Sequence, residues 1–165
     1  MQKMIVFGIV RGLHDLFTAL WIGGLLTTAL SFMPVFKKFK GKLKGLNQVL
    51  VLYQKKTSVF AIISIFGLWL TGLLLSKQSP AYSGFLNFST TTNILLSLKH
   101  LLVFVMILIA LYRRFVLGRK LENLDAKGQK IYGILLMVNS LLGVVVLFLS
   151  GIGASLAQAA LMTIR

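Results

Sequence analysis

The sequence predicts an all-α membrane protein with four transmembrane helices in an up-down-up-down bundle. Its residues are 57% hydrophobic and only 13% charged, whereas about a quarter of the residues are charged in a typical soluble domain. Four apolar stretches approach or exceed the roughly 20 residues that a helix needs to cross a bilayer. They cover residues 5–35, 58–76, 93–117 and 131–162. Because only short polar segments separate them, we expect a single domain over residues 1–165.

The first span differs from a cleaved signal sequence. Arg11, His14 and Asp15 interrupt it early, where a signal peptide would have an unbroken apolar region. We therefore expect this helix to be retained. Pro34 and the basic run over residues 37–44 are expected to end it.

The other spans are bounded by polar segments. Pro80 and Gly84 indicate a turn between the second and third spans. Small residues in membrane helices commonly allow close helix packing. We expect this role for five glycines: Gly23, Gly24, Gly143, Gly151 and Gly153. The spacing of Gly8 and Gly12 is compatible with a homo-oligomer.

The charges indicate how the helices are oriented in the membrane. The net charge is +15, from 18 basic and 3 acidic residues. The linkers after the first and third spans hold most of the basic residues, which is typical of cytoplasmic segments. We therefore expect the cytoplasmic membrane, with both termini on the outer side and both linkers facing anionic lipid headgroups. This distribution argues against a nucleic-acid partner. The linker residues are Lys37, Lys38, Lys40, Lys42, Lys44, Lys55 and Lys56, then Arg113, Arg114, Arg119, Lys120, Lys127 and Lys130.

Several classes of chemistry have no support in the sequence. The chain has no cysteine, which excludes disulfides, thiolate metal sites and haem attached through cysteine. No carboxylate pair, phosphate-binding loop or Ser-His-acid order indicates a hydrolase or transferase.

Two histidines in separate spans, His14 and His100, are the main candidates for a site. Ionisable residues within a span usually face the bundle interior. At a rise of about 1.5 Å per residue, His14 lies roughly 30 Å and His100 roughly 22 Å from the inner ends of their helices. Both therefore belong to the outer half of the bilayer, where they could bind one metal.

The first hypothesis is haem b between the first and third spans, with both histidines as axial ligands. Trp21 and Phe104 lie on the histidine faces and would be the walls for the ring. Such a protein would transfer electrons, with a quinone or an external redox protein as its partner.

Charged residues beside the histidines have two interpretations. Arg11 and Lys99 could pair with the haem propionates. Alternatively, Lys99 extends to the lipid headgroups. Asp15 could orient an imidazole or form a purely structural pair with Arg11, four residues before it. Asn139 and Ser140 are expected to bond to a neighbouring helix.

Copper is the second hypothesis, with the two histidines and Met4 as candidate ligands. The methionines form no ladder across the membrane, so the sequence shows no through-path. A third possibility is a bundle without a cofactor that serves as a subunit of a larger membrane complex.

Four segments resemble the membrane domain of copper resistance protein D (CopD). They are "LHDLFTALWIGGLL", "FAIISIFGLWLTGLLL", "TTTNILLSLKHLLVFVMILIALYRR" and "NSLLGVVVLFLSG". The resemblance implies four helices in this order and a role in copper uptake or tolerance.

His14, Trp21 and Lys99 also resemble features of HemJ-type protoporphyrinogen oxidases, which bind haem b. The basic residue and histidine that follow the proline turn in that family are missing here, and Arg11 stands where a lysine is expected. The resemblance therefore implies haem binding more than oxidase activity.

Overall fold

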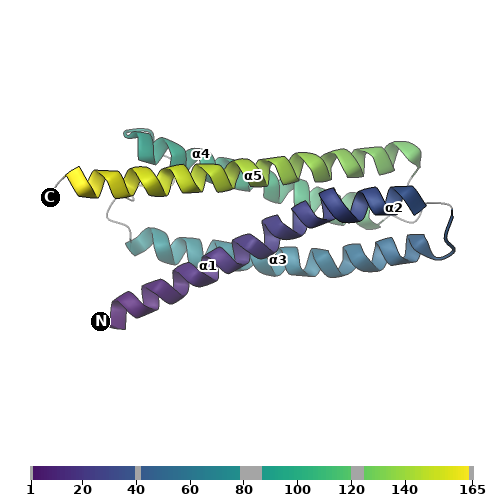
Figure 1. The fold of residues 1–165 in the computed structure, drawn as a ribbon, viewed down its shortest axis with the longest axis horizontal. Coiled ribbons are helices and arrows are strands. Elements are labelled where there is room, and N and C mark those ends of the chain that lie inside the picture. The colour runs from purple at the N-terminus through teal and green to yellow at the C-terminus, as the bar shows by residue number, and fades with distance from the viewer. Residues whose placement is uncertain (1, 40–41, 79–86, 120–124, 164–165) are drawn as a thin grey trace.

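The computed structural model describes residues 2–39, 42–78, 87–119 and 125–163, and these residues are almost entirely helical. Figure 1 shows the helices as one elongated bundle in which consecutive spans run in opposite directions. The start of the first helix and the end of the last lie together, at what we call the terminal end; the other is the linker end. In chain order the elements are α1 (Gln2–Thr27), a π-helical turn η1 (Thr28–Phe32), α2 (Met33–Phe39), α3 (Leu46–Gln78), α4 (Thr91–Tyr112), a second π-helical turn η2 (Arg113–Leu117) and α5 (Ala126–Thr163).

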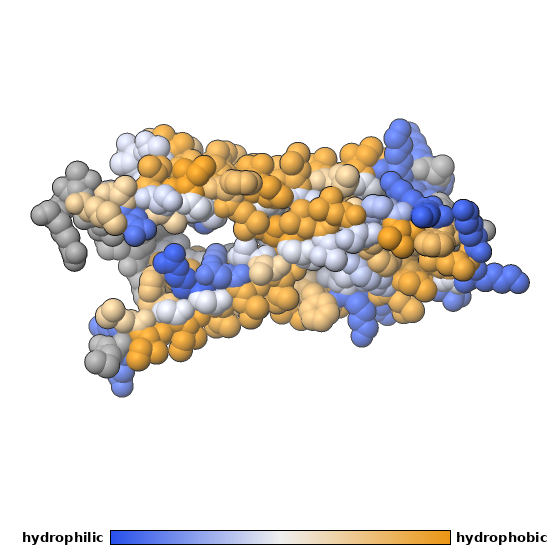
Figure 2. Space-filling view, viewed as in Figure 1, coloured by the Kyte–Doolittle hydropathy of each residue, from blue (hydrophilic) through white to orange (hydrophobic). Residues whose placement is uncertain are grey.

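Four helices are long and apolar enough to cross a membrane, which confirms the predicted fold class. They cover Gln2–Phe39, Gln48–Ser76, Thr91–Leu117 and Lys127–Leu156. Apolar side chains cover most of the length of the bundle, and hydrophilic residues gather at the linker end (Figure 2). This is the surface that a lipid environment requires.

The main difference in helix bounds concerns α3, which is longer than the predicted 58–76. It begins at Leu46, so Lys55 and Lys56 lie on a helix and not in an irregular linker. Gly45 immediately precedes it with a φ of +79°, a left-handed conformation that glycine adopts without steric cost.

Pro34 does not end the first helix as predicted. The helix continues to Phe39, and η1 ends at Phe32, two residues before the proline. There the Met33 N–H bonds to the Thr28 carbonyl, five residues back. Proline removes one helical hydrogen bond, and a π-helical turn is one way in which a helix absorbs such an interruption. The first residues of the basic segment, Lys37 and Lys38, therefore belong to the last turn of the helix.

The spans pack as two hairpins. α1 packs mainly along α3 and α4 along α5, while α1 and α5 join the hairpins. Towards the terminal end α1 diverges from α5 (Figure 1). A buried cluster of Trp21, Ile22, Met106 and Val146 lies between the hairpins. The bundle is thus tightly held in its middle and open at the terminal end.

Close helix contact depends on Gly67, which was not among the expected glycines, and on Gly143, which was. A Cβ at Gly67 would collide with the ring of Phe17, and one at Gly143 would lie 3.1 Å from Ile22. A Cβ at Gly23, Gly24, Gly151 or Gly153 would meet nothing within 4 Å, so the packing role predicted for these four is wrong within this chain, and only Gly143 has it.

We predict that Gly67→Ala lowers the thermal unfolding temperature in detergent by several degrees, because the added methyl displaces Phe17 from α3. Gly151→Ala is the matched control and should leave the temperature unchanged or raise it slightly, since alanine favours a helix by about 0.5–1 kcal/mol. Equal responses of the two variants would contradict the proposed α1–α3 contact.

Candidate functional site

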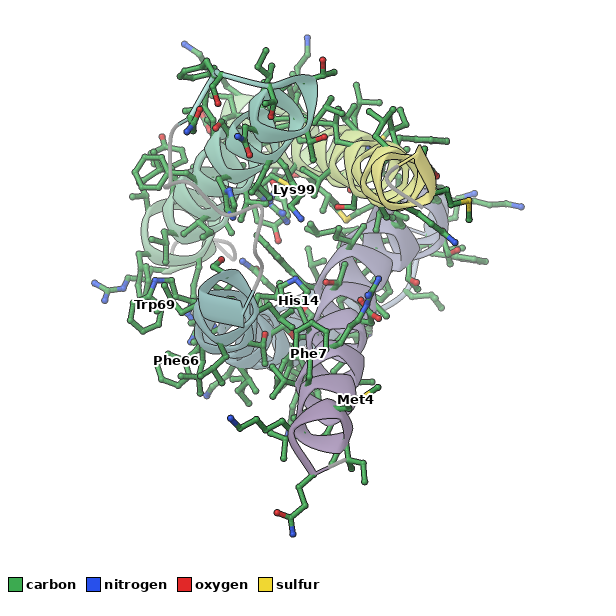
Figure 3. The ribbon with its side chains drawn as sticks, turned by 90° about the vertical axis from the view of Figure 1, so that its left-hand side faces the viewer. Met4, Phe7, His14, Phe66, Trp69 and Lys99 are labelled. Carbon is green, nitrogen blue, oxygen red and sulfur yellow. The ribbon has the colours of Figure 1, made fainter. Side chains whose placement is uncertain are left out.

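A cavity of about 340 Å³ lies between the spans, and all four contribute to its lining. His14 comes from α1, Gly72 from α3, Lys99 and His100 from α4, and Ser150 from α5. Figure 3 looks into the bundle from the terminal end, with His14 and Lys99 directed into the space between the helices. Figure 2 shows a recess with hydrophilic residues between α1 and α5 at this end. The two candidate histidines therefore share one cavity, as the sequence predicts.

The His14 ring is held in a defined orientation by α3. Its Nδ1 lies 2.9 Å from the Thr71 Oγ1, and the Thr71 hydroxyl donates its own hydrogen to the Gly67 carbonyl at 2.6 Å. Since that hydrogen is already used, the His14 Nδ1–H is the donor to Thr71. The lone pair of the ring is then on Nε2. A second residue that orients a histidine in this way is typical of metal sites.

His100 and Lys99 come from consecutive positions on α4, and both are partly buried. The His100 ring interacts with the backbone of Leu96, one turn earlier. Lys99 is close enough to interact electrostatically with both histidines and with Asp15. The cavity therefore contains a cationic group beside two imidazoles.

Trp21 and Met106 form the floor of the cavity. Trp21 is 3% exposed and lines it as predicted, while Met106 is fully buried and lines it from α4. Helical spacing did not indicate Met106 as a site residue, because six residues place it about 120° around the helix axis from His100.

Three residues expected at the site lie elsewhere. Phe104 is 57% exposed and does not line the cavity, because the buried side of α4 follows Val103 and Met106 and leaves His100 at its edge. Arg11 is exposed and outside the lining. Met4 is 79% exposed and points away from the cavity (Figure 3), because α1 has diverged from the bundle at this level.

The described residues contain no group of three or more His, Cys, Asp or Glu side chains able to hold a metal. Among the described residues, the lining offers two imidazoles and one thioether, that of Met106. Such a set suits a soft ion of low coordination number better than zinc, magnesium or calcium.

Three buried polar groups near the middle of the bundle have no hydrogen-bond partner. They are the Trp21 Nε1, the Ser64 Oγ and both amide atoms of Asn139. The prediction that Asn139 bonds to a neighbouring helix is therefore wrong. It is confirmed for Ser140, whose hydroxyl lies 3.3 Å from the Leu25 carbonyl on α1. Unpaired polar groups in a dry core lower the stability of the folded protein, and each of them needs an explanation.

We predict that Asn139→Leu raises the unfolding temperature in detergent, because leaving a buried amide unpaired costs about 1–3 kcal/mol. Ser140→Ala is the neighbouring control and should lower it or leave it unchanged, since it removes a contact between helices. A fall in the unfolding temperature of Asn139→Leu would mean that the amide is satisfied by internal water.

Comparison with known proteins identifies the family. The family model for copper resistance protein D matches residues 55–153, which is more than half of the chain and includes α4 with Lys99 and His100. His14 lies before the matched region. Neither the curated proteins nor the solved structures contain a match. On the strength of the family match, the chain belongs to the CopD family of membrane proteins.

Proposed function

We propose that this protein binds copper in the cavity at its terminal end and serves copper transport or tolerance in the cytoplasmic membrane. The observation that carries the proposal is the arrangement of His14, His100 and Met106 around one cavity in a CopD-family chain. The basic residues at the linker end support a cytoplasmic position for that end. The cavity then opens towards the outer side, where copper arrives.

The donor set favours cuprous copper. Thioether and imidazole ligands suit Cu(I), and the Nε2 lone pair of His14 is directed away from its Thr71 partner. Because Thr71 already orients the ring, little further ordering of His14 is needed on binding. The copper ion is the cargo of such a site. Its release requires weak binding, and a small number of ligands keeps the binding weak.

Lys99 determines how tightly the ion is held. An ammonium group beside both histidines repels a copper cation. Asp15 interacts with Lys99 and favours its charged form. Lys99 therefore weakens the site, and a weakened site can load copper and still release it.

Haem b between α1 and α4 is the second candidate. The observation in its favour is that Lys99 could pair with a propionate while the two histidines ligate iron from different helices. The cavity of about 340 Å³ is near the lower end of the roughly 300–1,000 Å³ range of small-molecule sites. A porphyrin would have to part the helices further, whereas a copper ion requires no such change. We therefore place copper first.

We predict that purified protein binds one Cu(I) in competition with a chromophoric chelator under reducing conditions. His14→Ala and Met106→Leu should each weaken binding by about tenfold or more, as expected when a ligand worth at least 1.4 kcal/mol is removed. Met106→Leu conserves side-chain volume, so the fold should persist. Met4→Leu, at an exposed methionine, is the matched control and should bind as the wild type does.

The absorption spectrum of the same preparation separates the two candidates. After haem supplementation, a Soret band that is lost in His14→Ala and in His100→Ala would favour haem. Unchanged copper affinity in all three ligand variants would exclude the cavity as the copper site.

We also predict that Lys99→Met binds Cu(I) more tightly than the wild type. At an effective dielectric constant of about 20, the repulsion between two unit charges a few ångströms apart amounts to about 4 kcal/mol or less, so an increase of about tenfold or more is expected. In cells this variant should take up copper more slowly, because release becomes limiting. Lys3→Met, which removes an exposed charge from the same end, is the control; weaker copper binding by Lys99→Met would contradict the assigned role.

A further inference from the structure

A second cavity, of about 380 Å³, lies at the linker end of the bundle. It shares only Trp21 with the first cavity, and the proposed copper ligands do not line it. Its polar lining comes mainly from α3 and from the end of the third span, with Tyr53, Gln54 and Arg113 as members. No acidic residue is among the described residues that line it.

Arg113 is the unusual group in this cavity. The side chain is 9% exposed, and its Nε has no hydrogen-bond partner. The guanidinium lies over the Tyr132 ring, with the Cζ 4.5 Å from the ring centroid. A cation–π contact of this kind is weaker than the cost of removing an arginine from water. The buried charge therefore calls for an anion.

The described acidic side chains are placed elsewhere. The chain has three acids, Asp15, Glu122 and Asp125. Asp15 interacts with Lys99 at the terminal end, and the exposed Asp125 accepts a hydrogen bond from the Gly128 N–H at the start of α5. Glu122 lies outside the described residues. The test below therefore includes Glu122.

The remaining lining indicates the chemistry of the ligand. Gln54 brings an amide group to the lining. The hydroxyl hydrogens of Tyr53 and Thr57 are already donated, to the Thr28 Oγ1 and to the Tyr53 carbonyl. Among these groups, Gln54 and Arg113 are therefore the ones left to bind a ligand. Leu20 and Phe60 also line the cavity while being 45% and 59% exposed on the outer surface of the bundle. The cavity therefore reaches the lipid-facing surface. A ligand with an anionic, oxygen-rich head and an apolar chain would satisfy both parts.

Arg113 lies near the linker end of the third span. It is four residues before the end of that span at Leu117, or about 6 Å at the helical rise. A long arginine side chain this close to the end of a span can meet a lipid phosphate, which it binds through paired N–H groups. We propose that this cavity binds the phosphate of an anionic phospholipid, with Arg113 as the principal contact.

The proposal is tested by thermal unfolding of the full chain in a neutral detergent. Short-chain phosphatidylglycerol should raise the unfolding temperature, while phosphatidylcholine of the same chain length and inorganic phosphate should have little effect. In Arg113→Gln, the concentration of phosphatidylglycerol needed for the same rise in unfolding temperature should increase by about tenfold or more. Arg119→Gln removes an exposed arginine near the same end and should respond as the wild type does.

Two further variants keep the result interpretable. Arg113→Lys retains the charge and should retain part of the lipid effect, even if Arg113→Gln folds poorly. In Glu122→Gln the lipid effect should be unchanged.

Four results would overturn the proposal. Stabilisation by inorganic phosphate alone would assign the cavity to a free anion. If phosphatidylglycerol raised the unfolding temperature of Glu122→Gln but not that of the wild type, Glu122 would already neutralise Arg113. Equal loss in Arg113→Gln and Arg119→Gln would indicate general surface attraction, and no stabilisation of the wild type by phosphatidylglycerol would leave the cavity without a lipid ligand.

Discussion

The scarcity of water inside a bilayer is the constraint on which this structure depends. A polar group within a span that finds no partner inside the bundle lowers the stability of the folded protein. Most hydroxyl groups find a partner locally, as Thr18 does by donating to the His14 carbonyl one turn earlier. The exceptions are few and lie between the helices. Asn139, Ser64 and the indole N–H of Trp21 are buried without partners, and Trp21 lines both cavities.

The packing of α1 on α3 links this constraint to the candidate site. The absence of a side chain at Gly67 admits Phe17 from α1, and the Gly67 carbonyl accepts the hydroxyl hydrogen of Thr71. Thr71 in turn orients His14. One close contact between two helices thus determines the direction of a candidate metal ligand. A change at Gly67 is expected to disturb stability and copper binding together.

Positive charge is common to both cavities. Lys99 lies beside the histidines in one, and Arg113 lies over Tyr132 in the other. In the proposed functions the two charges have opposite consequences. Lys99 opposes a cationic cargo and so favours its release, whereas Arg113 attracts an anionic headgroup. In the two proposals, a cation of limited exposure weakens the copper site at one end and holds a lipid headgroup at the other.

Much of the architecture could be predicted from the sequence because hydropathy is a local property. The four spans, the polar lining of the first helix and the meeting of His14 with His100 in one cavity all follow from apolar length and a period of 3.6 residues. Helix bounds were less predictable. Pro34 forbids one hydrogen bond, yet whether the helix ends or passes through a π-helical turn depends on its neighbours.

Side-chain roles required the tertiary structure, because helical spacing leaves the inward direction uncertain by tens of degrees. Phe104 lies only about 40° around the helix axis from His100 and is nevertheless exposed, whereas Met106 is fully buried. Helical spacing also does not reveal Thr71, since no sequence pattern connects residues 57 positions apart. The sequence by itself determined that this chain crosses the membrane four times and carries two histidines at comparable depth. Only the packing of helices decided which side chains surround them, because that depends on contacts between residues distant along the chain.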